Sequence, residues 1–343
     1  MRMTRGWAAG EPGAALRPWD FARRDVGDRD VAVRIHHCGI CGSDLDAVRG
    51  GGPTAFPLVP GHEIVGEITE VGSGVSRFSI GDQVAVGNIV GSCGRCAACR
   101  AGRENWCAQV TLTYGGSDGS GNTTQGGYSS EYVLDEHFVY RLPEGLDPAE
   151  VAPLMCAGVT TYSPLRRRGV GQGTAVGVVG LGGLGHVGVK LARALGAEVS
   201  VFTTSPGKAE TALALGAEDA VVSTDASQMA AQTGRFDFIL DTVGAPHELG
   251  PYFDTLGIDG TLCLVGITPE ALRVDPMSLI PGAKSLAGSG SGGVPETQEM
   301  LDLCAEHGIT ADVERVTPDR LDEALDRLAR NDVRHRFVLD LTG

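Results

Sequence analysis

The chain of 343 residues is 42% hydrophobic, so it can bury one or two hydrophobic cores, and two domains are expected. Its 43 acidic residues outnumber 28 basic ones, and a surface with a net charge of −15 repels a phosphate backbone. Nucleic acids are therefore not expected partners. Membrane insertion is not expected either, because no stretch approaches the roughly 20 apolar residues that span a bilayer.

Residues 1–150 are predicted to be mostly β. Short segments rich in alternating or β-branched residues, set between Gly, Pro and Asp, lie at 30–38, 62–72, 82–90, 128–135 and 137–143. The opening stretch "MRMTRGWAAGEPGAALRPWDF" contains no apolar run long enough for the core of a signal peptide. We therefore expect a cytoplasmic protein whose cysteines stay reduced.

From about residue 153 the pattern changes to strand, glycine turn and helix. Apolar runs that alternate with helical stretches lie within 174–205, 212–223, 236–244 and 260–267. This alternation predicts a parallel sheet with right-handed crossovers. Two amphipathic helices at 295–308 and 321–330 and a strand at 336–341 form a tail that we expect to fold back on the first domain.

The stretch "SCGRCAACRAGRENWC" at residues 92–107 holds four of the nine cysteines: Cys93, Cys96, Cys99 and Cys107. In a reducing compartment such a cluster more often binds a metal or takes part in catalysis than forms disulfides. Four cysteines without an open position are typical of a structural zinc site. The alternative is a transient redox cluster, which needs one exposed thiol with a lowered pKa.

The segment "VGVVGLGGLG" contains Gly180-x-Gly182-x-x-Gly185 between an apolar strand and a helix. In this context Gly180 makes a tight turn, Gly182 lets a pyrophosphate approach the backbone, and Gly185 allows the helix to pack closely on the sheet. The pattern predicts a dinucleotide site at the helix N-terminus. The alternative is close packing of helix and strand in a glycine-rich chain.

The end of the next strand indicates which nicotinamide cofactor is used. An NAD site usually has Asp or Glu about 20 residues beyond the glycines. Here that position is occupied by Thr203, Thr204 and Ser205, with Lys208 close behind. Hydroxyls and an ammonium group suit a 2′-phosphate, which a carboxylate would repel, so the sequence favours NADP(H). The alternative is that Lys208 is only a solvated lysine at a helix start.

Three further segments carry thiol or imidazole ligands beside turn residues: "CGICGSD" with Cys38 and Cys41, "PGHE" with His62 and Glu63, and "LMCAGVTTY" with Cys156. Each is weak evidence alone, because a buried cysteine is most often a small hydrophobic residue. Together with a dinucleotide loop they indicate a dehydrogenase that uses a metal as Lewis acid. Two cysteines, one histidine and an open position form a catalytic zinc arrangement of alcohol dehydrogenases.

The chain resembles the zinc-dependent medium-chain dehydrogenase/reductase superfamily and, within it, the cinnamyl alcohol dehydrogenase-like branch. The matching segments are "CGICGSD", "PGHEIVGEI", the four-cysteine loop, "QGGYSSEYVLDEHFVYRLP", "APLMCAGVTTYSPL", "VGLGGLGHVGVK" and "ETQEMLDLCAEHG", in this order over nearly the whole chain. The resemblance implies an α/β fold with two domains. One is a Rossmann doubly wound parallel-sheet domain that binds NADP(H) (153–287), and the other is a β-rich GroES-like catalytic domain with a structural zinc lobe (1–152 and 288–343).

The resemblance also implies roles for individual residues. Cys41, His62 and Cys156 would bind the catalytic zinc, and Glu63 would visit the metal during ligand exchange. Asp44 would orient His62, and Ser43 would pass a proton to or from the substrate oxygen, whereas Cys38 would be a packed neighbour. The four cysteines of the loop would hold a structural zinc ion, which gives two zinc ions per chain.

For the cofactor, the resemblance adds Thr160, Gly183, Leu184, Val265 and Gly266 to the residues named above. The stretch "SLIPGAKSLAGSGS" at 278–291 resembles the edge strand through which members of the superfamily pair about a two-fold axis, so a homodimer is expected. Two positions depart from the family. Asp46 stands where members often have a relay histidine, and Leu112 lies at or near a substrate-pocket tryptophan of plant members.

The expected function is that of an NADP(H)-dependent zinc alcohol dehydrogenase or aldehyde reductase, with an allylic or aromatic primary alcohol as substrate. One alternative is a relative that reduces an activated C=C or C=N bond and needs no proton relay to an alkoxide, against which the presence of Ser43 argues mildly. Another is a zinc-stapled nucleotide-binding scaffold or redox sensor. The joint presence of Cys41, His62 and Cys156 disfavours this last reading.

Overall fold

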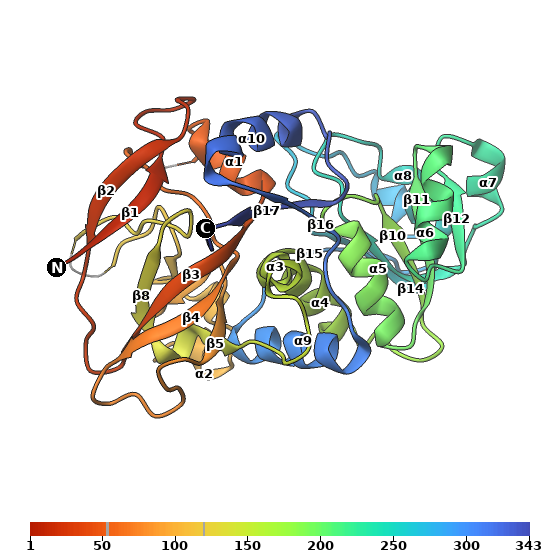
Figure 1. Cartoon of the computed structure of the whole chain (residues 1–343). Coiled ribbons are helices and arrows are strands. Elements are labelled where there is room, and N and C mark those ends of the chain that lie inside the picture. Colours follow the sequence, from red (N-terminus) through yellow and green to blue (C-terminus); the bar gives the residue numbers. More distant parts are fainter. Residues whose placement is uncertain (53–54, 119–120) are drawn as a thin grey trace. The chain divides into compact units, whose positions relative to one another are not determined.

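The computed structural model describes residues 1–52, 55–118 and 121–343, and it divides into two compact units (Figure 1). Unit 1 comprises Met1–Cys156 and Gly292–Gly343, and unit 2 comprises Ala157–Ser291. The chain therefore leaves unit 1 once and returns to it, so the C-terminal helices and strand belong to the same unit as the N-terminal strands.

Unit 1 is built on a seven-stranded sheet in the order β16-β17-β3-β4-β5-β9, with β8 paired to β3. Its strands are β3 (Asp30–Ile40), β4 (Ile64–Val71), β5 (Gln83–Val86), β8 (Glu131–Asp135), β9 (Val139–Arg141), β16 (Val313–Val316) and β17 (Arg336–Asp340). The long strand β3 pairs with β4, β8 and β17, and nearly all its residues are buried. The residues that follow β3 are thereby held at the centre of the unit.

Among the described residues of unit 1, two small ribbons and five α-helices accompany the sheet. The ribbons are β1 (Arg2–Ala8) with β2 (Arg17–Arg23), and β6 (Ile89–Gly91) with β7 (Thr111–Leu112). The helices are α1 (Gly42–Val48), α2 (Ala97–Arg100), α3 (Pro148–Val151), α9 (Val294–His307) and α10 (Leu321–Ala329). Helix α1 directly follows β3, and α2 lies within the four-cysteine loop.

Two strand predictions were wrong in their extent. Residues 82–90 form two strands, β5 and β6, because the pairing stops at Gly87 and the chain bends at Asn88. An added Cβ on Gly87 would lie 3.3 Å from the carbonyl oxygen of Met155. Residues 137–143 form only the three-residue strand β9. Before it a 3₁₀ turn at Glu136–Phe138 is capped by the Asp135 carboxylate, which accepts the N–H of His137 at 2.8 Å.

Unit 2 contains a six-stranded parallel sheet in the order β12-β11-β10-β13-β14-β15, which confirms the predicted Rossmann-type architecture. Its strands are β10 (Ala175–Val179), β11 (Glu198–Thr203), β12 (Asp219–Val222), β13 (Phe236–Asp241), β14 (Leu256–Leu264) and β15 (Ser285–Gly288). The helices are α4 (Ala157–Arg167), α5 (Gly185–Ala194), α6 (Ala209–Ala214), α7 (Ala226–Ala230) and α8 (Gly250–Thr255).

Both faces of the central strands of unit 2 are buried, as expected for a parallel sheet covered by helices. One core contains Phe202, Phe236 and Phe253, packed with residues of α7 and α8. The carboxyl ends of β10, β11, β13 and β14 meet at one edge of this sheet because the strands are parallel. The loops that follow these four strands are therefore neighbours, which is where a doubly wound sheet binds its ligand.

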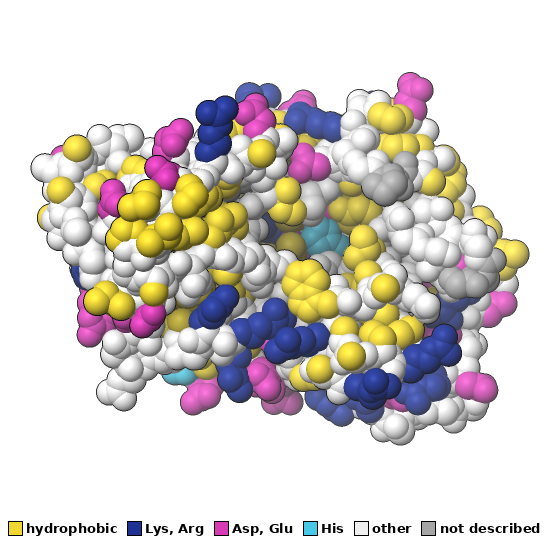
Figure 2. Space-filling view, turned by 180° about the vertical axis from the view of Figure 1, so that it is seen from behind, with side chains coloured by type: hydrophobic (Ala, Val, Ile, Leu, Met, Phe, Trp, Pro, Cys, Tyr) yellow, Lys and Arg dark blue, Asp and Glu magenta, His cyan; other side chains and the backbone are white. Residues whose placement is uncertain are grey.

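Strand β15 lies at the end of the sheet, and large hydrophobic side chains are exposed on it and on the segments beside it: Ile258, Ile267, Met277, Ile280 and Leu286. Figure 2 shows that hydrophobic side chains on the face drawn there gather into a broad patch.

Among the described residues, no helix has both the length and the apolar character needed to cross a bilayer.

Candidate active site

Four ligand-type side chains meet inside unit 1. Cys41 caps the N-terminus of α1, His62 and Glu63 directly precede β4, and Cys156 follows a 3₁₀ turn at Ala152–Met155. One ligand atom of each lies within 4.8 Å of the others. Three of the four residues are buried and Cys156 is half-buried, so a bound ion would be largely shielded from water.

This group has the donor set and spacing of a zinc site. The sulfur atoms of Cys41 and Cys156 are 3.9 Å apart, which is too far for a disulfide. Two thiolates on one tetrahedral zinc ion, each about 2.3 Å from the metal, are separated by about 3.8 Å. Within the described part of the chain, Oε2 of the buried Glu63 has no hydrogen-bond partner, so this oxygen is available to a cation.

A buried carboxylate, Asp44, connects the segments that carry these ligands. Its oxygens accept the backbone N–H of Cys41 at 2.9 Å and that of Gly61 at 3.0 Å. Oδ1 also lies 3.0 Å from Nδ1 of His62, and Oδ2 accepts the Tyr128 hydroxyl at 3.3 Å. Because Nδ1 faces Asp44, the other ring nitrogen of His62 is the one directed at the ligand group.

The charge of the site is balanced by Arg336, the first residue of β17. Its guanidinium group is 4% exposed, donates to Oε1 of Glu63 and lies 4.0 Å from the sulfur of Cys41. Burial raises the pKa of Glu63 to about 7, although the nearby Arg336 charge opposes that rise. Burial also disfavours a charged His62, but Asp44 and Cys41 together outweigh this and raise the imidazole pKa.

The cysteines of this region differ in the direction of their pKa shifts. The sulfur atoms of Cys41 and Cys156 lie within hydrogen-bonding reach of each other, and this contact lowers the pKa of Cys41 well below its ordinary value. Burial instead raises the pKa of Cys38, whose thiol points to the carbonyl oxygen of Gly39 at 3.7 Å. Cys38 lies outside the group of four ligands, so the structure places it beside the site but not in it.

The other predicted residues of this region lie on or near α1. Ser43 is exposed in the first turn of α1, and Asp46 is exposed one residue after Leu45 on the same helix. Leu112 on β7 is 47% exposed. The Tyr114 ring packs against the His62 ring at a centroid distance of 5.7 Å, and its hydroxyl interacts with Asp44 and Ser43.

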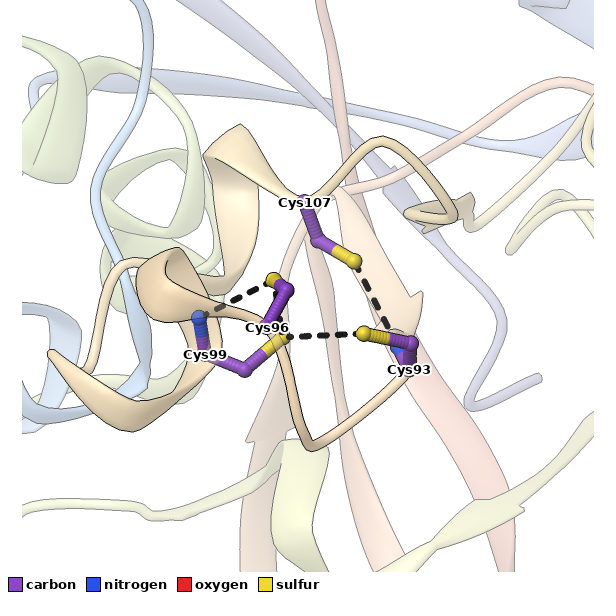
Figure 3. A group of neighbouring side chains, drawn as sticks. All are labelled: Cys93, Cys96, Cys99 and Cys107. Carbon is purple, nitrogen blue, oxygen red and sulfur yellow. Dashed lines mark hydrogen bonds between the residues drawn. The ribbon is translucent and has the colours of Figure 1, made fainter.

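The four cysteines of the loop form a second cluster, in which all four sulfur atoms turn inward (Figure 3). The sulfur of Cys99 lies 3.9 Å from that of Cys93 and 3.4 Å from that of Cys96, so these thiols are free rather than paired as disulfides. Backbone N–H groups point at the sulfurs: Cys93 donates to Cys107, and Cys99 donates to Cys96. Backbone N–H groups of Arg95 and Cys96 lower the pKa of Cys93 to about 6, toward the thiolate form that metal binding requires.

In unit 2, the predicted glycine loop has room for a ligand. Gly180 has a φ of +88°, which favours glycine, and its carbonyl oxygen would lie only 2.1 Å from a Cβ on Gly185. An added Cβ on Gly182 would meet nothing within 4 Å. Gly183 follows in the loop, and Leu184 precedes the first residue of α5, so backbone N–H groups at this helix start are available to a phosphate.

The predicted 2′-phosphate residues lie at the end of β11. The Thr203 hydroxyl is buried and accepts the N–H of Ser205 at 3.1 Å, so it closes the turn after the strand. Thr204 and Lys208 are exposed and Ser205 is half-buried. Of the remaining cofactor residues, Thr160 lies on α4 and is 8% exposed, while Val265 and Gly266 follow β14 at the same edge of the sheet.

Sequence reasoning missed Arg336, Tyr114 and the contact of Tyr128 with Asp44. These residues lie far from the ligands along the chain, and no local spacing connects them to the site. A charged residue at the start of the apolar strand "RFVLDL" was the one signal that could have drawn attention to Arg336.

We expect Arg336→Met to destabilise the protein by about 3–5 kcal/mol at pH 8, because it leaves a buried carboxylate without its countercharge. The effect should shrink as the pH falls. The variant raises the pKa of Glu63 further above its unfolded value, and the protonated acid needs no countercharge. Urea unfolding at pH 8 and pH 6 measures both effects.

The exposed pair of Arg320 and Glu323 provides the control, since Arg320→Met removes a cation that water already screens. The double variant Arg336→Met with Glu63→Leu should recover much of the lost stability. If Arg336→Met unfolds at the same urea concentration as Arg320→Met, the guanidinium group of Arg336 does not stabilise the site.

Comparison with known proteins places this chain in a family. Residues 27–144 match the family described as "Alcohol dehydrogenase GroES-like domain", and residues 183–306 match "Zinc-binding dehydrogenase". A protein of Fragaria ananassa called "Probable mannitol dehydrogenase" is 51% identical over 339 residues, which cover 98% of this chain and 94% of that protein.

Solved structures are similar over the whole chain. A cinnamyl alcohol dehydrogenase from Sorghum bicolor has a TM-score of 0.96 at 45% identity, covering 100% of this chain and 98% of that one. The structure of CAD from Helicobacter pylori, complexed with NADP(H), has a TM-score of 0.92 at 37% identity, covering 99% and 98%. The chain therefore belongs to the zinc-binding alcohol dehydrogenases of the medium-chain dehydrogenase/reductase superfamily, in the cinnamyl alcohol dehydrogenase-like branch.

Proposed function

We propose that this protein interconverts an allylic or aromatic primary alcohol and its aldehyde with NADP(H) as hydride carrier and two zinc ions per chain. The observation that carries the proposal is the buried group of Cys41, His62, Glu63 and Cys156. Its donor set suits a catalytic zinc ion better than a structural one. Cys41, His62 and Cys156 form a Cys2His set, which leaves a fourth position open for a substrate.

In this proposal Cys41, His62 and Cys156 would hold the catalytic zinc, and Glu63 would be a further, exchangeable ligand. Bound there, zinc supplies Lewis-acid polarisation of the substrate oxygen. Asp44 fixes the ring of His62 through Nδ1. Arg336 holds the Glu63 carboxylate by donating a hydrogen bond to its Oε1. The exposed Ser43 hydroxyl passes a proton to or from the substrate oxygen, and the adjacent Tyr114 hydroxyl can orient it.

The remaining assignments are made on the same basis. Cys93, Cys96, Cys99 and Cys107 hold a structural zinc ion. Residues 153–287 act as the cofactor-binding domain, and residues 1–152 with 288–343 act as the catalytic domain. The nine free cysteines are consistent with a reducing, cytoplasmic setting.

The first test is a substrate screen with NADPH, read as the loss of its absorbance. Allylic and aromatic aldehydes should be reduced, whereas enones and iminium compounds should not. Reduction of a C=C or C=N bond with no turnover of any aldehyde would contradict the proposal.

Two cysteine variants distinguish the two metal sites by activity, unfolding temperature and zinc content. Cys41→Ala should abolish aldehyde reduction, because it removes a catalytic ligand while leaving the fold intact. Cys99→Ala should instead lower the unfolding temperature, since structural zinc contributes folding free energy. Elemental analysis should find about two zinc ions in the wild type and about one in each variant. The assignment of the sites is wrong if Cys41→Ala retains activity.

The cofactor assignment is tested by kinetics. NADPH should exceed NADH in kcat/KM by roughly tenfold to a hundredfold, because charge-assisted hydrogen bonds to the 2′-phosphate are worth roughly 1.5–3 kcal/mol each. Lys208→Ala should raise KM for NADPH but not for NADH. Thr204→Asp should narrow or invert the preference, since it places a carboxylate at the exposed end of β11.

The control is Arg235→Ala, which removes an exposed cation that precedes β13, at the opposite edge of the same sheet. It should leave both KM values unchanged. Equal efficiency of the wild type with the two cofactors would show that the end of β11 does not select NADPH.

We also propose a homodimer that forms through the free edge of β15. Its unpaired edge and the exposed hydrophobic side chains beside it would both be covered by a second copy. Light scattering should report twice the chain mass of 35.6 kDa at micromolar concentration. Leu286→Lys should give a monomer, whereas Leu213→Lys, at an exposed leucine on α6, should leave the dimer intact. A monomeric wild type would exclude this assembly.

A further inference from the structure

A buried acid, Asp241, pairs with a half-buried histidine, His247, at the end of β13, outside every residue set predicted from the sequence. Asp241 is the last residue of the strand and is fully buried. Its Oδ1 accepts the N–H of Val243 at 3.0 Å, and its Oδ2 lies 2.8 Å from Nε2 of His247. Nδ1 of His247 lies 2.8 Å from the carbonyl oxygen of Ala245. The two side chains therefore close the loop at residues 242–247 from both ends.

The proton requirement of this pair follows from its geometry. The carbonyl oxygen of Ala245 can only accept, so Nδ1 of His247 must carry a proton. The contact between Nε2 and Asp241 then requires a second proton, on either the imidazole or the carboxyl group. Burial raises the pKa of Asp241, which favours retention of this proton. The pair is thus joined by a charge-assisted or acid-to-imidazole hydrogen bond between a buried carboxyl group and a half-buried ring.

The loop that this pair closes lies against two glycines predicted to bind the cofactor. The backbone N–H and the hydroxyl of Thr242 both donate to the carbonyl oxygen of Val179, at 3.1 Å and 2.7 Å. A Cβ on Gly180 would lie 3.1 Å from the Thr242 hydroxyl oxygen, and one on Gly266 would lie 2.2 Å from the carbonyl oxygen of Val243. The loop at residues 242–247 therefore lies between the glycine turn after β10 and the turn after β14.

The backbone of Asp241 joins the same arrangement. Its carbonyl oxygen accepts the N–H of Val265 at 2.9 Å and that of Gly266 at 3.2 Å. One residue thus holds the turn after β14 through its backbone and the loop after β13 through its side chain. Any shift of the loop at residues 242–247 would change the surface that Gly180 and Gly266 present to a ligand.

We propose that the Asp241–His247 pair is a positioning element of the dinucleotide site: by closing the loop at residues 242–247 it shapes the surface beside Gly180 and Gly266 before the cofactor binds. The proposal rests on the proposed function in assuming that a dinucleotide binds at the glycine loop. A preformed site avoids the cost of ordering the loop during binding, so the pair increases cofactor affinity. It does not touch the reacting atoms, so turnover with bound cofactor should not depend on it.

The test measures the dissociation constants of NADPH and NADH by nicotinamide fluorescence on the full-length, zinc-loaded protein. His247→Leu keeps the bulk of the side chain but removes the hydrogen bond, and it should weaken binding on the order of tenfold. His247→Asn should do the same, because its shorter amide reaches Ala245 but not Asp241. His247→Gln places an amide nitrogen at the position of Nε2 and should bind within about threefold of the wild type.

Turnover numbers provide the second readout. At saturating cofactor, kcat of all three variants should equal that of the wild type, so that the whole effect lies in cofactor KM. The neighbouring Glu248→Gln is the matched control, since Glu248 is exposed and directly follows the loop, and it should change neither constant. His247→Asn retains a polar side chain and serves as the folded comparison if the leucine variant does not fold.

The outcomes separate this inference from the proposed function. If the wild type binds neither NADPH nor NADH, the proposed function fails and this inference with it. If the wild type binds one of them and the leucine and asparagine variants bind it equally well, only the inference fails. It also fails if glutamine is no better than leucine, or if kcat falls while the dissociation constant is unchanged.

Discussion

The active-site segment of this protein depends on one buried carboxylate. Asp44 accepts hydrogen bonds from the backbone of Cys41 and Gly61, from the imidazole of His62 and from the Tyr128 hydroxyl. A buried carboxylate without donors would cost several kcal/mol, so these segments are held together around it. The same four contacts set the start of α1, the direction of His62 and the position of the chain before β4. Gly61 makes the approach feasible, because a Cβ there would lie 2.5 Å from the Tyr128 ring.

Charge balance is the second condition that this site must meet. Thiols, an imidazole and two acids are enclosed with a single guanidinium group, that of Arg336. A zinc ion adds two positive charges where two thiolates would otherwise repel each other in a medium of low polarity. In the four-cysteine loop, backbone N–H groups point toward the sulfur atoms and so offset the negative charge of thiolates there. Each site therefore places hydrogen-bond donors beside its sulfur atoms: Arg336 beside Cys41, and backbone N–H groups in the loop.

Local features could be predicted from the sequence, and contacts between distant segments could not. The four cysteines lie within one loop, and the glycine turn links one strand to the next helix, so spacing alone indicated each of them. Cys41, His62 and Cys156 are far apart in the chain. Their segments could be grouped as a candidate Cys2His site, but only the resemblance to a family singled out these three residues. Arg336 and Tyr114 carry no motif, because their partners are distant in the chain. Asp241 and His247 are only six residues apart, but no known spacing marks them as a pair. The break between β5 and β6 was missed for the same reason, since the close approach of Gly87 to Met155 is a tertiary contact.

The central claim is that one chain holds two zinc ions in chemically different sites, and zinc X-ray absorption spectroscopy on the fully loaded enzyme tests it most directly. Four thiolates at one ion and two at the other give a mean of three sulfur ligands per zinc, at about 2.3 Å, with nitrogen or oxygen ligands at about 2.0–2.2 Å completing the shell. A mean of four sulfur ligands, with one zinc ion per chain, would contradict the account, because it would leave Cys41, His62 and Cys156 without their metal.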